Sequence, residues 1–166
     1  MTSGIGRWLT RRVELDGAKL ALISSERRLT YDELNRRVNR LANALNERGV
    51  RQGDRVAGLL PNGNEILEIM FACAKLGAIF VPVNVRLTSE EVRYILDDSS
   101  SRTLFYHRSL APVVEPFRGT LPQILHWVCV GGEGAGQSEY ESLLHRMSDV
   151  EPDFEVSLEH VHLMMY

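Results

Sequence analysis

Amphipathic and apolar segments alternate along the chain, and their periods predict helices separated by strands. From Tyr31 to Arg48 apolar residues recur every three or four positions, which predicts a helix with one buried stripe. The segment from Asn64 or Glu65 to Leu76 is apolar on almost every face, so we expect a helix buried between two layers. A third, shorter helix is predicted from Ser89 to about Asp97.

A shared capping pattern marks four predicted helix starts. In each case a Ser, Thr or Asn stands three residues before a Glu, so that the cap can accept from a free backbone N–H while the Glu reaches back to the cap. The four pairs are Thr30 with Glu33, Asn62 with Glu65, Thr88 with Glu91, and Ser138 with Glu141.

Short apolar runs lie between the helices and predict strands. A small hairpin is expected over residues 20–30, before the first of these helices. Near-continuous apolar runs alternating with helices predict an α/β fold, doubly wound, with a mostly parallel sheet covered by helices on both faces. Pro82 should lie at a strand end or sheet edge, because it cannot donate to the ladder. The predicted strands are 55–60, 79–83, 103–106, 125–130, and a buried terminal run over 161–166.

Composition narrows the class of protein. The 166 residues are 44% hydrophobic and 25% charged, and the net charge of −3 gives no electrostatic case for nucleic acid or an anionic membrane. Cys73 and Cys129 lie in apolar runs and are expected to be buried, reduced thiols. We expect a cytoplasmic protein, since neither a secretory signal sequence nor an apolar run of about 20 residues is found.

Two local groups of residues resemble parts of known binding sites, but neither has the spacing of a complete site. The glycines from Gly131 to Gly136 follow a strand, but their spacing does not match a dinucleotide loop, and a flexible surface connection is favoured. His160 and His162 could share one face of an extended segment, yet no third ligand has a recognisable spacing, so no metal site is predicted. No catalytic residue is nominated within the chain.

Several blocks, in order, resemble the adenylate-forming superfamily, whose enzymes contain an AMP-binding domain. The sequence RLTYDEL at 28–34 is similar to the first block of the family, and AKLGAIFVPVN at 74–84 is similar to the second. Residues 53–57 and 60–63 are also similar to the sequences that the family has at these places. The terminal residues 164–166 resemble the strand before the phosphate-binding loop of the family. The sequence VNVRLT at 83–88 resembles the acyl- and aryl-CoA synthetases, although Val85 replaces a common proline.

The resemblance implies an AMP-forming ligase that joins a carboxylate, that of a fatty acid, to coenzyme A through an acyl-adenylate. ATP, Mg²⁺ and coenzyme A would be its cofactors. The chain would be an incomplete N-terminal subdomain of a larger acyl-CoA synthetase fold, with a core at 18–108, a variable region at 109–157 and a strand at 158–166 leading to a phosphate loop beyond Tyr166. Only Tyr166 would lie near the nucleotide, at the border of that loop.

Two alternatives remain open at this stage. A self-standing, non-catalytic α/β binding module could keep the scaffold without the chemistry, and an amino-acid adenylation domain of a peptide synthetase shares the superfamily. If the chain is a piece of a larger ligase, it should be inactive alone and should self-associate through apolar surface on its last strand.

Overall fold

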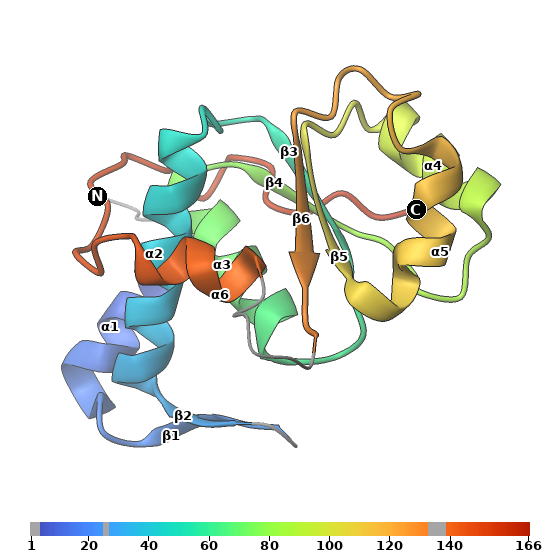
Figure 1. Cartoon of the computed structure of the whole chain (residues 1–166). Helices are drawn as coiled ribbons and strands as arrows, with labels where there is room; N and C mark the ends of the chain where they lie inside the picture. Colours follow the sequence, from blue (N-terminus) through green and yellow to red (C-terminus); the bar gives the residue numbers. More distant parts are fainter. Residues whose placement is uncertain (1–3, 25–26, 133–138) are drawn as a thin grey trace.

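A four-stranded parallel sheet forms the centre of the computed structural model, which describes residues 4–24, 27–132 and 139–166. The strands are β3 (Arg55–Leu59), β4 (Ile79–Pro82), β5 (Thr103–His107) and β6 (His126–Val130), in the order β4-β3-β5-β6 (Figure 1). All three strand pairings are parallel. The predicted α/β class is therefore confirmed, and Pro82 ends β4 as its missing N–H requires.

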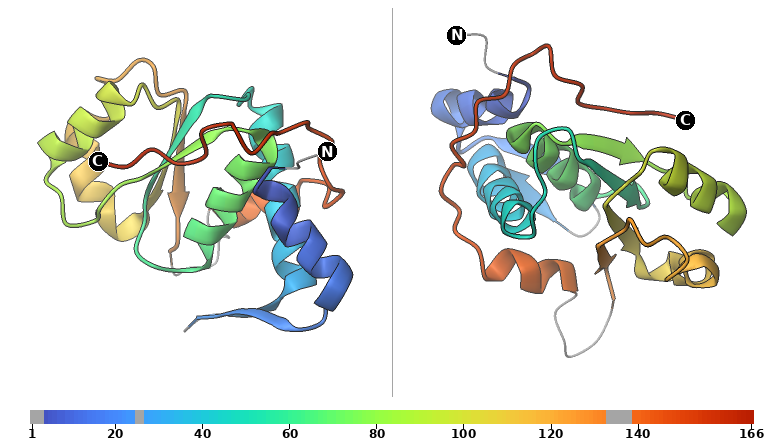
Figure 2. Two further views of the ribbon diagram at one scale, coloured as in Figure 1. Left: turned by 180° about the vertical axis from the view of Figure 1, so that it is seen from behind. Right: turned by 90° about the horizontal axis from the view of Figure 1, so that it is seen from above.

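Helices cover both faces of this sheet (Figure 2). One face carries α2 (Tyr31–Glu47), α3 (Asn64–Leu76) and α6 (Glu139–His145), with α1 (Gly6–Asp16) packed outside α2 and α3. The other face carries α4 (Ser89–Asp98) and the short helices η1 (Arg108–Leu110), α5 (Ala111–Val114) and η2 (Glu115–Phe117). The three helices predicted by periodicity are confirmed to within one residue.

Two of the four predicted caps have the expected geometry. The hydroxyls of Thr30 and Thr88 each accept from the backbone N–H of the Glu three residues on, and each Glu accepts from the cap's own N–H. The cap predicted at Asn62 is wrong: α3 begins at Asn64 as expected, and its N-cap is Gly63, which has no side chain to accept a hydrogen bond. Ser138 lies outside the described residues, although α6 begins next to it.

Helix α1 is the main element that periodicity did not predict. Its start is tied down by the bond from the Gly4 N–H to the carbonyl of Val156. A Cβ on Gly6 would lie 2.7 Å from the backbone nitrogen of Lys75, so only glycine lets α1 approach α3 this closely. The predicted hairpin follows α1 as β1 (Leu20–Ile23) and β2 (Arg28–Thr30), paired antiparallel.

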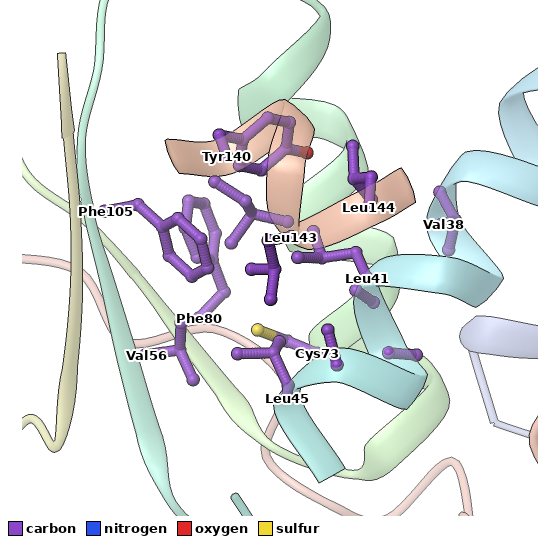
Figure 3. Close-up of a cluster of buried hydrophobic side chains, with 14 of the residues drawn as sticks. Val38, Leu41, Leu45, Val56, Cys73, Phe80, Phe105, Tyr140, Leu143 and Leu144 are labelled. Carbon is purple, nitrogen blue, oxygen red and sulfur yellow. The ribbon is translucent and has the colours of Figure 1, made fainter. Parts of the chain in front are cut away.

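The larger core cluster fills the space between the sheet and α2, α3 and α6 (Figure 3). Phe105 of β5 and Tyr140 of α6 meet edge to face, with ring centroids 5.9 Å apart. Phe80 of β4 packs over Gly58, where an added Cβ would lie 2.9 Å from the ring. Cys73 is fully buried in this cluster, as predicted, and burial raises the pKa of its thiol.

The terminal run is not the buried strand that the sequence predicts. Residues 161–166 run beside the outer edge of β4 and form one isolated parallel bridge, between Leu163 and Phe80. The N–H of Phe80 donates to the carbonyl of His162, and the N–H of Met164 donates to the carbonyl of Phe80. Because no element covers its outer side in the described chain, Met165 is 73% exposed and Tyr166 55% exposed.

A buried ionic cluster joins the helices above the sheet. Glu68 of α3 is fully buried and accepts two hydrogen bonds from Arg37 of α2, at 2.7 and 3.0 Å, and one from the hydroxyl of Tyr140, at 2.6 Å. Arg37 also donates to Glu141, at 2.7 and 3.1 Å, and Glu141 pairs with Arg27 beside the hairpin. Burial works against the charge of Arg37, but its bonds to Glu141 and Glu68 outweigh that cost and raise its pKa.

Replacing Glu68 by Leu should destabilise the fold by about 3–5 kcal/mol, because it leaves Arg37 buried with half of its partners. Chemical unfolding followed by circular dichroism measures the loss. The double variant Arg37→Met/Glu68→Leu should recover part of it, since no unpaired charge then remains. The matched control Glu90→Leu removes a carboxylate that is 83% exposed and should change stability by less than about 0.5 kcal/mol; equal losses at both sites would contradict the role of the cluster.

The docking of the terminal segment should weaken in mild acid. Both ring nitrogens of His162 are buried without a hydrogen-bond partner in the described part of the chain, and burial lowers the pKa of this imidazole below its ordinary 6.5. As the pH falls through 6.5, the undocked or unfolded state therefore takes up the proton first, and the docked state loses stability. Hydrogen exchange at the Met164 amide, which donates to Phe80, should accelerate below pH 6.5 beyond the intrinsic rate.

The variant His162→Leu is the control for this prediction, because it has no proton to gain. It should show no such acceleration, and an identical acid response in both proteins would show that another group controls the docking.

Candidate functional site

The carboxyl ends of the parallel strands gather the loops of this chain at one edge of the sheet, the position where open α/β sheets bind ligands. Residues 60–63 follow β3, residues 83–88 follow β4, residues 108–110 follow β5, and Gly131 follows β6. The terminal segment runs parallel to β4 and carries Tyr166 toward the same edge. We describe this edge as the candidate site.

His107 and Gly131 make the closest approach at this edge. His107 pairs with Val130 in register, so Gly131 begins the loop beside its imidazole. A Cβ on Gly131 would lie 2.6 Å from Nε2 of His107, and the residue has a φ of +77°, which strongly favours glycine. Nδ1 of His107 accepts from the backbone N–H of Ser109 and lies 2.7 Å from its hydroxyl, which fixes the ring.

Arg108 stands beside the second glycine. A Cβ on Gly132 would lie 2.8 Å from Nε of Arg108, so the arginine side chain packs directly on the glycine backbone. The exposed Arg108 places a cation at the carboxyl end of β5. Residues 133–136 of the predicted glycine loop lie outside the described residues, so the expected flexible connection stays a prediction. The close packing of Gly131 and Gly132 against His107 and Arg108 could not be read from spacing, because it depends on strand register.

The loop after β4 is closed by its own polar groups. The side-chain oxygen of Asn84 accepts from the N–H of Arg86, at 3.0 Å, and its carbonyl accepts from the N–H of Leu87, at 3.2 Å. These bonds make a local turn that leads into the capping box of α4 at Thr88. Asn84 therefore has a structural role in the loop where the sequence resembles CoA synthetases.

Tyr166 contacts α4. Its hydroxyl donates to Oδ2 of Asp98 at 2.6 Å, and that bond raises the pKa of Tyr166 to about 12. The phenol therefore stays protonated at neutral pH, and it is a hydrogen-bond donor rather than a base. No described contact tests a nucleotide-binding role, so the place of Tyr166 near the nucleotide stays a prediction.

His160 and His162 have different surroundings. The amide nitrogen of Gln52 lies 2.6 Å from Nε2 of the exposed His160, and the N–H of Ser157 donates to its Nδ1. Both histidines line a narrow crevice with a free volume of about 10 Å³, roughly that of one water molecule. Among the described residues, no three His, Cys, Asp or Glu side chains are grouped as metal ligands.

No helix in the described ranges is long and apolar enough to cross a membrane.

Cys129 is half-buried rather than buried, and both cysteines are free. These free thiols agree with the predicted reduced state. The prediction of burial is correct for Cys73 and wrong for Cys129.

Comparisons with known proteins give the family. The model of the family described as "AMP-binding enzyme" matches residues 9–166. A feruloyl-CoA synthase of Amycolatopsis sp is 39% identical over 164 residues, which are 98% of this chain and 30% of that protein. The fatty acid–[acyl-carrier-protein] ligase ScoC of Streptomyces coeruleorubidus is 40% identical over 138 residues, which are 82% of this chain and 26% of that protein.

A solved structure confirms the fold. The crystal structure of the N-terminal domain of FACL13 from Mycobacterium tuberculosis superposes with a TM-score of 0.91 at 32% identity, covering all of this chain and 42% of that one. The chain thus spans less than a third of the length of the two curated relatives above. The matched range includes the region after residue 109, where the sequence resemblance is weak, so the whole architecture from α1 onward is that of the family. The chain belongs to the AMP-binding enzyme family.

Proposed function

We propose that this chain is the N-terminal part of an AMP-forming carboxylate–CoA ligase, with a fatty acid as the carboxylate substrate. The observation that carries the proposal is the family match over residues 9–166 together with relatives whose names are those of CoA and carrier-protein ligases. ATP, Mg²⁺ and coenzyme A are the cofactors of the proposed reaction, in which the carboxylate displaces pyrophosphate and the thiol then displaces AMP.

The proposed reaction needs functional groups that the described residues do not supply. The phosphates of ATP need backbone donors and cations, and the attacking carboxylate must be held in line with the α-phosphorus. At the carboxyl edge this chain presents Arg108 as an exposed cation and a short, self-bonded turn at Asn84. The best-packed polar groups, including Glu68 and Lys75, are instead committed to partners inside the fold. We therefore assign the chain a scaffold role within the proposed ligase.

The full-length gene product should form acyl-CoA and release pyrophosphate and AMP in equal amounts when given a carboxylate, ATP, Mg²⁺ and coenzyme A. A coupled pyrophosphate assay with palmitate and with ferulate separates the two acyl classes named by its relatives. The 166-residue chain alone should release none above the rate without enzyme. Turnover by the isolated chain would refute the scaffold role, and amino-acid-dependent turnover without coenzyme A would favour a peptide-synthetase domain.

We further propose that Tyr166 borders the nucleotide site of the ligase, with Asp98 holding its hydroxyl. In the full-length enzyme, Tyr166→Phe removes the bond to Asp98 that holds the ring in place, and the loss of this one hydrogen bond should raise the KM for ATP by roughly fivefold to tenfold while leaving the KM for the carboxylate unchanged. Phe154→Ala, at an aromatic that is 38% exposed and lies outside residues 161–166, is the matched control and should change neither constant. An unchanged KM for ATP in the Tyr166 variant would remove this residue from the site.

The self-association expected of the isolated chain stays a prediction. Its apolar terminal segment, with Val161 59% and Met165 73% exposed, is the surface that the full-length protein would have to cover.

A further inference from the structure

Lys75 is a buried cation with a full set of partners. It lies in the last turn of α3, and its side chain is only 2% exposed. A charge so far removed from water destabilises a fold unless each of its protons has an acceptor. Nζ of Lys75 donates to Oγ1 of Thr10 at 3.0 Å and to Oδ1 of Asn35 at 2.9 Å, and its third bond goes to Oε1 of Glu151. One ammonium group thus joins α1, α2 and α3 to the chain that follows α6.

The carboxylate of Glu151 is shared by the same group of side chains. Oε1 accepts from the hydroxyl of Thr10 at 2.7 Å, and Oε2 accepts from the amide of Asn35 at 3.5 Å. Burial alone would raise the pKa of Glu151, but its bonds with Lys75 and Thr10 lower it below the ordinary value. Burial lowers the pKa of Lys75, and the bond to Glu151 opposes that shift.

The chain around Glu151 depends on side chains of other elements for its hydrogen bonds. Residues 149–156 contain no helix or strand, so their backbone groups need partners from elsewhere. Asn39 of α2 donates to the carbonyl of residue 149 at 2.9 Å, and Asn43 donates to those of residues 148 and 150 at 2.9 and 3.1 Å. Asn35, Asn39 and Asn43 are spaced four apart, so they form one row along α2 that ends at the buried ion pair.

A single stretch of chain holds the 151–166 segment at two places. Lys75 holds Glu151 at the start of the segment, and Phe80, five residues after Lys75, forms the parallel bridge with Leu163 near its end. Figure 2 shows the chain passing from α6 beside α2 and α1 to the edge of the sheet at β4. Tyr166 lies three residues beyond the second of these contacts.

Polar contacts carry most of this docking, because the segment buries little apolar surface. Leu158, Val161, Leu163 and Met165 are all exposed. The two ring nitrogens of the intervening His162 make no hydrogen bond within the described part of the chain. Loss of the ion pair should therefore release the segment from a fold that otherwise stays intact.

We propose that Lys75 is a positioning residue of the ligase: by holding Glu151, it fixes the 151–166 segment and thereby the phosphate-binding loop that this segment leads to. The role rests on the proposed function, in which that loop follows Tyr166. Backbone donors stabilise phosphate charge only when they are held in place beforehand, and the apparent affinity for ATP falls with the fraction of molecules in which they are. Lys75 acts on ATP through Glu151 and without contact to the nucleotide.

Hydrogen exchange in the full-length protein measures the docking without any need for activity. Lys75→Met should accelerate exchange at the Gly4 and Met164 amides, which bond to or within the 151–166 segment, by roughly tenfold to a hundredfold, the effect of losing a bond between charged groups. Glu151→Gln should act in the same direction; its side chain is 30% exposed, so this variant folds even if burial makes Lys75→Met unstable. Lys19→Met, at the exposed second lysine of the chain, is the matched control and should change neither amide.

Steady-state kinetics distinguish positioning from general stabilisation. Lys75→Met and Glu151→Gln should each raise the KM for ATP by roughly threefold to tenfold, and leave kcat at saturating ATP and the KM for the carboxylate unchanged. The double variant should be no worse than Lys75→Met, because both changes break one contact. Val128→Ala removes buried apolar surface on β6, at the opposite edge of the sheet from the segment, so it should lower the thermal midpoint without changing the KM for ATP.

Two results would overturn the proposal. One is unchanged exchange at Gly4 and Met164 in both variants of the ion pair. The other is faster exchange with an unchanged KM for ATP, or with a KM that Val128→Ala raises equally, which would reduce Lys75 to a packing role. An unmodified full-length protein without ligase activity would instead refute the proposed function and the kinetic role with it, and the exchange data would still decide whether Lys75 holds the segment.

Discussion

A buried carboxylate is the constraint on which the arrangement of this fold depends. Glu68 lies on the nearly all-apolar helix α3 and is fully removed from water, so its charge must be met inside the protein. Arg37 from α2 and Tyr140 from α6 meet it, and Glu141 and Arg27 complete the cluster. The cluster thereby links three helices and the turn of the hairpin above the sheet.

The two faces of the sheet are consequently stabilised in different ways. Above it, the ionic cluster lies over a core of aromatic and aliphatic side chains that includes Phe105 and Phe80. Below it, α4 and the short helices up to η2 pack through a separate, mainly aliphatic cluster. Both layers lie along the sheet and leave its carboxyl edge to the loops. An edge of this kind suits a protein that positions loops for a site shared with a larger structure, in keeping with the scaffold role proposed above.

Much of this fold could be predicted from the sequence because its signals are local. The stripe of α2, the capping boxes at Thr30 and Thr88, and the apolar strand runs all follow from residue spacing. Helix α1 could not, because it depends on a glycine that lets one backbone approach another at Lys75. The terminal run has the composition of a buried strand, but burial requires a neighbour on each side, and the described chain supplies only β4.

At the candidate site, too, some features could be predicted from the sequence and others could not. The resemblance alone predicts that Tyr166 lies near the nucleotide, whereas the contact of His107 with Gly131 depends on the pairing of β5 with β6, which no spacing reveals. The family resemblance is therefore more informative about function, and the register of the strands is more informative about the geometry of the candidate site.

We propose above that this chain is the scaffold of a ligase whose phosphate-binding groups lie elsewhere in the same protein. The most direct test is the nucleotide sequence of the source gene immediately after the codon for Tyr166. We expect a loop rich in Thr, Ser and Gly that contains a lysine, encoded in frame. A stop codon at that point would contradict it and would make the chain a self-standing module without the proposed ligase activity.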